Sequence, residues 1–83
     1  MKKLKHRNDC VIELLKIHYA HTYVIANRLR MRKVFVKTSD VLANMKQLEK
    51  DGYAKSIKEG LGYRWSLTED GIDSFSSLLK GCL

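Results

Sequence analysis

The feature that most constrains this chain is the order of local patterns between Val41 and Gly71, which reads VLANMKQLEKDGYAKSIKEGLGYRWSLTEDG. A helix pattern ends at Asp51-Gly52, two short alternating runs follow around a glycine-containing connection, and a helix start comes directly after them. With 83 residues the chain can bury only one modest core. We therefore expect a single domain over 1–83, in which helices and one β-hairpin pack together.

The helix expected over 38–51 has an apolar side and a polar side. Val41, Met45 and Leu48 follow i, i+4, i+7 spacing and are expected to face the core. Small and amide side chains on the other side are the types that read base edges in a DNA major groove, although an ordinary solvated helix face is the alternative. The candidate reading residues, with their flanks, are Lys37, Thr38, Ser39, Asp40, Ala43, Asn44, Lys46 and Gln47, followed by Lys50.

The hairpin expected over 53–67 alternates apolar and polar residues on both sides of the turn Lys58-Glu59-Gly60-Leu61-Gly62. Two glycines permit backbone angles that are closed to other residues, so the tip can bend and approach another surface. Trp65 lies at an alternating strand position and is expected in the core. A solubilising edge hairpin is one interpretation. The other is a set of phosphate contacts, with Lys58 or Arg64 at a minor groove, made by Lys55, Lys58, Gly60 and Arg64.

The remaining patterns complete a helical frame. After a basic tail over 1–8, one core helix is expected to run to about Tyr19 with Glu13 outward, and a second is expected from the cap Thr22 to about Arg32. The turn after this helix is expected to pack against the core through the apolar residues Val34, Phe35 and Val36. A last helix over 68–80 has the apolar stripe Ile72, Phe75, Leu78 and Leu79. The second helix and its turn carry a basic segment with a local positive field, which is expected to contact the DNA backbone and is made of Arg28, Arg30, Arg32 and Lys33.

Charge and composition narrow the class of partner. A formal net charge of +7 on so small a chain favours polyanionic partners. No apolar run approaches the length of a membrane span, so a cytoplasmic protein is expected, in the host cytoplasm if the source is a virus. No phosphate loop or nucleophile motif is present, which predicts a non-enzyme without a cofactor or small-molecule substrate.

Cysteine and histidine spacing predicts no metal site. Cys10 and Cys82 lack the paired spacing of zinc ligands and are expected to be spare or buried thiols, with a bridge between them or between protomers as the alternative. His18 and His21 with Cys10 could share a helix face, but no second close pair completes a tetrahedral set.

Two segments resemble the winged helix-turn-helix DNA-binding domains. Leu48-Glu49-Lys50-Asp51-Gly52-Tyr53 is similar to the end of their recognition helix, and Tyr63 to Gly71 is similar to their second wing strand and the following helix start. The likeness covers nearly the whole chain and implies an α+β fold with a three-helix core, a β-hairpin wing and a C-terminal helix. Small archaeal regulators and winged-helix proteins of archaeal viruses and plasmids are similar in size and basicity.

The resemblance also implies a function. The helix over 38–51 would enter the major groove of double-stranded DNA, the wing would lie on the backbone or minor groove, and many such proteins act as homodimers. This chain departs from many relatives at Ala43, where they place an arginine on the reading face.

Two hypotheses follow from these patterns. The first is a sequence-specific DNA-binding transcription regulator. The alternative is a winged-helix protein–protein interaction module without specific DNA binding, which would use the same surface or an apolar patch around Leu78, Leu79 and Leu83.

Overall fold

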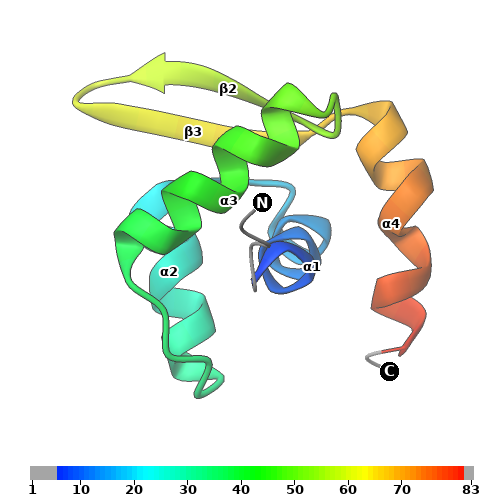
Figure 1. Ribbon diagram of the computed structural model, residues 1–83, viewed down its shortest axis with the longest axis horizontal. Coiled ribbons are helices and arrows are strands. Elements are labelled where there is room, and N and C mark those ends of the chain that lie inside the picture. Colours follow the sequence, from blue (N-terminus) through cyan, green and yellow to red (C-terminus); the bar gives the residue numbers. More distant parts are fainter. Residues whose placement is uncertain (1–5, 82–83) are drawn as a thin grey trace.

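The computed structural model describes residues 6–81. Its elements, in chain order, are α1 (Arg7–Ile17), β1 (Tyr19–His21), α2 (Thr22–Met31), α3 (Thr38–Lys50), β2 (Ala54–Glu59), β3 (Gly62–Leu67) and α4 (Glu69–Gly81). In Figure 1, α1 lies in the centre, α2 and α4 stand on its two sides, α3 crosses the front, and the β2–β3 hairpin, called the wing below, extends over the top. The predicted α+β class is confirmed.

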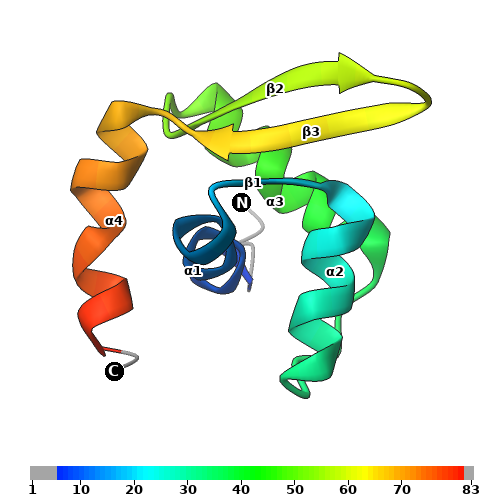
Figure 2. The same cartoon turned by 180° about the vertical axis from the view of Figure 1, so that it is seen from behind.

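The three strands form one antiparallel sheet in the order β1-β3-β2. In the wing, Ser56 pairs with Trp65 and Lys58 pairs with Tyr63, while Ala20 of β1 pairs with Trp65 from the other side. Figure 2 shows β1 crossing beneath the wing on its way from α1 to α2. The short strand β1 therefore fastens the base of the wing to the helical body.

The first helix ends earlier than predicted, and β1 was not predicted at all. The chain leaves α1 at His18, whose φ is 71° and whose N–H donates to the carbonyl of Leu14. A left-handed residue ends a helix by turning the chain away from its axis. Tyr19 is thus a strand residue rather than the last helical one. At the other end, α1 already includes Arg7, which was expected in the basic tail.

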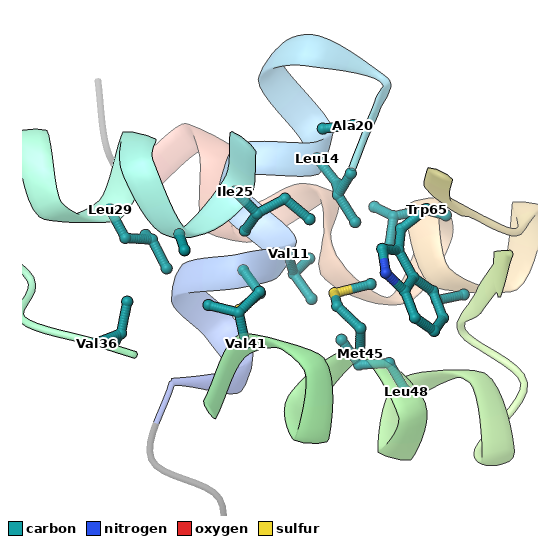
Figure 3. Close-up of a cluster of buried hydrophobic side chains, with 14 residues drawn as sticks. Val11, Leu14, Ala20, Ile25, Leu29, Val36, Val41, Met45, Leu48 and Trp65 are labelled. Carbon is teal, nitrogen blue, oxygen red and sulfur yellow. The ribbon is translucent and has the colours of Figure 1, made fainter. Parts of the chain in front are cut away.

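The core lies between the sheet and α1, α2 and α3 (Figure 3). The predicted inward positions Val41, Met45 and Leu48 are fully buried, as is Trp65. The indole Nε1–H of Trp65 donates to Thr22 Oγ1 at 2.8 Å, which satisfies the one polar group of a buried tryptophan. This bond links β3 to the first turn of α2.

Two other expectations about burial are wrong. Glu13 was expected to point outward, but it is 1% exposed and forms ion pairs with Arg28 and Arg32. Phe35 was expected in the core, but it is 84% exposed, while Val34 and Val36 on either side pack inward. Successive side chains of an extended segment point to opposite sides, so three consecutive apolar residues cannot all enter the core.

The last helix is fixed to the end of the wing. Thr68 Oγ1 accepts from Gly71 N at 3.1 Å and donates to the carbonyl of Gly52 at 2.7 Å. Phe75 contacts Tyr53 edge-on with 5.1 Å between ring centroids. Phe75 and Leu78 pack against the core as the apolar stripe predicts, whereas Ile72 remains 46% exposed. The side chain of Leu79, and residues Cys82 and Leu83, lie outside the described part of the chain.

Candidate nucleic-acid interface

The outer face of α3 is polar and open to solvent. Asp40 caps the helix start, since its Oδ2 accepts from the backbone N–H of Lys37 at 3.1 Å. Gln47 donates from Nε2 to Asp51 Oδ1 at 3.0 Å, and this contact is exposed. The predicted reading residues and flanks that are exposed as expected are Lys37, Thr38, Ser39, Asp40, Ala43, Lys46 and Gln47.

Asn44 does not belong to this face. It is 2% exposed, its Nδ2 donates to the carbonyl of Asp40 at 2.8 Å, and its Oδ1 has no hydrogen-bond partner among the described residues. Position 44 is i+3 from Val41 and i−4 from Leu48, so it falls inside the apolar arc of the helix. The full i, i+3, i+4, i+7 pattern would have placed Asn44 inward. The reading face is therefore smaller than predicted.

The wing divides its cations between its two faces. Lys58 pairs across the ladder with Tyr63, and Tyr63 alternates with Arg64 along β3, so Lys58 and Arg64 point to opposite sides of the sheet. Arg64 Nε lies 3.4 Å from Glu59 Oε2, and its guanidinium stacks 5.0 Å from the ring centre of Tyr19. Arg64 is therefore engaged on the outer face, between β1 and the wing. Lys55, Lys58 and Gly60 are exposed as expected, and Gly60 has φ +63°.

The basic segment of α2 and its turn is mostly engaged in internal contacts. Arg28 Nε and Arg32 Nε lie 2.6 and 2.7 Å from the two carboxylate oxygens of Glu13. The negative charge of Glu13 offsets part of the positive field that the sequence predicts for this segment. Glu13 lies on α1, outside the basic segment, so the local sequence does not show this effect.

Arg30 and Lys33 complete the segment. Arg30 donates to the carbonyl of Val36, to Asn27 Oδ1 and to Thr38 Oγ1. It therefore ties the end of α2 to the first residue of α3 and fixes the angle of the helix-turn-helix. Lys33 is exposed in the turn with φ 64°.

Among the described residues, no group of three or more His, Cys, Asp or Glu side chains could hold a metal ion. Burial, with help from the nearby Asp9 and Glu13, raises the pKa of the Cys10 thiol to about 12. Because the thiolate is the reactive form, this cysteine is a packing residue at neutral pH.

No helix within the described residues is long and apolar enough to cross a membrane.

The arrangement defines a winged helix-turn-helix: α2 and α3 form the helix-turn-helix, and β2 and β3 form the wing beside it. No protein-family model and no curated protein matches this chain. Among solved structures, a PadR family transcription regulator from Clostridium difficile is 19% identical with a TM-score of 0.75, and the match covers 93% of this chain and 86% of that one.

Two further solved structures extend this likeness to archaea. SSV1 F-93, from an archaeal virus, is 20% identical with a TM-score of 0.78, and the match covers 99% of this chain and 90% of that one. RosR of H. salinarum is 15% identical with a TM-score of 0.75, over 99% of this chain and 76% of that one. The predicted winged helix-turn-helix fold is thus confirmed.

Proposed function

We propose that this protein is a transcription regulator that binds double-stranded DNA in a sequence-specific manner as a homodimer. The observation that carries the proposal is the exposed polar face of α3, which is free of bulky side chains and lies next to a wing with exposed lysines. Two proteins of similar structure, from Clostridium difficile and Clostridium thermocellum, are transcription regulators, which supports the same class. Such a protein would act where the DNA is, in the cytoplasm of a cell or of a viral host.

The chemistry of the α3 face suggests how bases are read. Gln47 can exchange its bond to Asp51 for a bidentate bond to adenine, and Ser39 can bond to several bases. Ala43 lets the helix approach closely and can touch a thymine methyl group. Lys46 at the edge of this face is suited to a phosphate. Asn44 is not among the residues proposed to contact bases, because its side chain is buried.

Backbone contacts come from the wing and from the turn before α3. Lys58 lies on the face of the wing that carries Tyr63, so it is the cation that we assign to the adjacent backbone or minor groove. Lys37 and Lys33 are exposed and can add phosphate contacts, whereas Lys55, which pairs with Ser66, lies on the same face of the wing as Arg64. Arg64 points to the opposite face, and Arg28 and Arg32 are paired with Glu13, so their contribution is smaller.

The test is a selection of duplexes from random DNA, followed by titrations at several salt concentrations with wild type, Gln47→Ala and Lys58→Ala. Gln47→Ala is expected to blunt the preference for the selected site and leave nonspecific binding intact. Lys58→Ala is expected to weaken binding to all sequences and to flatten the salt slope by about one unit. Equal losses on every sequence from both variants would contradict the assigned roles.

A protein–protein interaction module is the second candidate, and one observation favours it. Ile72 is a large apolar side chain that stays 46% exposed on α4. A protein that binds no duplex even at low salt, but that loses a protein contact on Ile72→Glu, would have this second function.

A further inference from the structure

A hollow of about 400 Å³ lies under the wing, at the first turns of α2 and α3. Its lining comes from three parts of the chain. These are the end of β1 and start of α2 (His21, Thr22, Tyr23), the start of α3 (Thr38), and the wing (Glu59, Leu61, Gly62, Tyr63). Because it lies between the start of the proposed reading helix and the proposed wing contact, a duplex that touches both must pass over it. No lysine or arginine is among the described residues that line it, and His21 lies 4.0 Å from Glu59, the acidic residue of the lining, so the remaining contacts to DNA there come from neutral groups.

The rim of the hollow offers apolar surface that the fold does not cover. Leu61, at the tip of the wing, is fully exposed, and Tyr23 is 59% exposed. Tyr63 is partly exposed beside the ring of Trp65. The exposed parts of these side chains can pack on the apolar faces of deoxyribose rings.

Two hydroxyl groups line the hollow, and each already accepts one internal hydrogen bond. Thr22 Oγ1 accepts from Trp65 Nε1 at 2.8 Å, and Thr38 Oγ1 accepts from Arg30 Nη2 at 3.2 Å. A hydroxyl has one hydrogen to donate besides the lone pairs that accept. Neither hydroxyl donates a hydrogen bond to another described residue, so the hydrogens of both can be donated to phosphate oxygens.

Glu59 is the one acidic residue in the lining, and basic neighbours hold its carboxylate. Its Oε2 lies 3.4 Å from Arg64 Nε, and its Oε1 lies 4.0 Å from His21 Nε2. The guanidinium charge of Arg64 lessens the repulsion between Glu59 and a phosphate that enters the hollow.

We propose that this hollow is a second DNA-contact site, in which the backbone of one strand sits on Tyr23, Tyr63 and Leu61 and accepts hydrogen bonds from Thr22 and Thr38. The inference rests on the proposed DNA binding and adds to it a neutral component of affinity. Neutral contacts release no counterions, so this component does not change the salt slope.

The experiment uses Tyr23→Ala and Leu61→Ala, two substitutions of exposed side chains, in fluorescence-anisotropy titrations of the selected duplex over a series of salt concentrations. Each variant is expected to bind about fivefold to tenfold more weakly at every salt concentration, which is the loss of one well-packed contact. The plots of log K against log salt are expected to run parallel to that of wild type, whereas Lys58→Ala changes the slope.

Tyr19→Ala is the matched control. Tyr19 is 60% exposed, almost the same as Tyr23, but it stacks on Arg64 on the outer face of the sheet. It is expected to bind DNA within about twofold of wild type. The thermal unfolding of each variant and the emission of Trp65, the single tryptophan of the chain, report whether the free protein keeps its fold.

The outcomes separate the two proposals. If wild type binds duplexes but both variants stay within twofold of it, the strand does not sit in the hollow and the inference is wrong while the proposed function stands. A loss that comes with a changed salt slope also overturns the inference, because the contact is then ionic. If wild type binds no duplex at low salt, the proposed function fails, and the inference fails with it.

Discussion

Asn44 and Gln47 carry the same amide group on α3, but only Gln47 reaches solvent. Converting each amide to an acid tests this difference with little change of shape. Asn44→Asp places a carboxylate in the core beside the carbonyl of Asp40, so we expect it to lower the free energy of unfolding by about 2 kcal/mol or more. Gln47→Glu, at an exposed position, should cost less than about 0.5 kcal/mol. Urea unfolding at pH 7 measures the free energy of unfolding of both variants. Equal decreases for the two would contradict the burial of Asn44.

The contact between α4 and the wing depends on a close approach at Gly71. A Cβ at this position would overlap the carbonyl oxygen of Tyr53, and that backbone cannot move without shifting the base of the wing. We expect Gly71→Ala to destabilise the fold by about 1–3 kcal/mol, in spite of the better helix propensity of alanine. Ser74→Ala, at an exposed position of the same helix, should be nearly neutral. Chemical denaturation followed by the emission of Trp65 compares the two variants, and a stable Gly71→Ala would show that α4 can move away from Tyr53.

Elements in which apolar residues recur at regular spacing could be predicted from the sequence. Contacts between elements that are distant in the sequence could not. The spacing of Val41, Met45 and Leu48 placed α3, and the alternation around Trp65 placed the wing. The three residues of β1 are too few for a period, and the turn at His18 has no glycine to mark it. The burial of Glu13 depends on two arginines from another helix. The hollow under the wing likewise joins three separate parts of the chain, so no local pattern could indicate it.

The size of the whole molecule suits a dimer on DNA. One protomer measures 33 × 30 × 28 Å, so two protomers related by a two-fold axis can place their α3 helices about one helical turn of DNA apart, roughly 34 Å. In the proposed homodimer, two bound copies would double the number of phosphate contacts and so offset the absence of an arginine at position 43.

We expect the selected site to have two-fold symmetry with half-sites about 10 base pairs apart. We expect the exposed Ile72 on α4 to lie in the dimer contact, so Ile72→Glu should convert the protein to a folded monomer in sedimentation experiments, because a buried unpaired carboxylate opposes association. That variant should still bind a single half-site but lose the gain from the second, which titrations on one-site and two-site duplexes measure. Glu69→Gln, at an exposed position near the start of the same helix, is the control and should remain like wild type. A wild-type protein that stays monomeric on a two-site duplex, with no gain over one site, would rule out the homodimer.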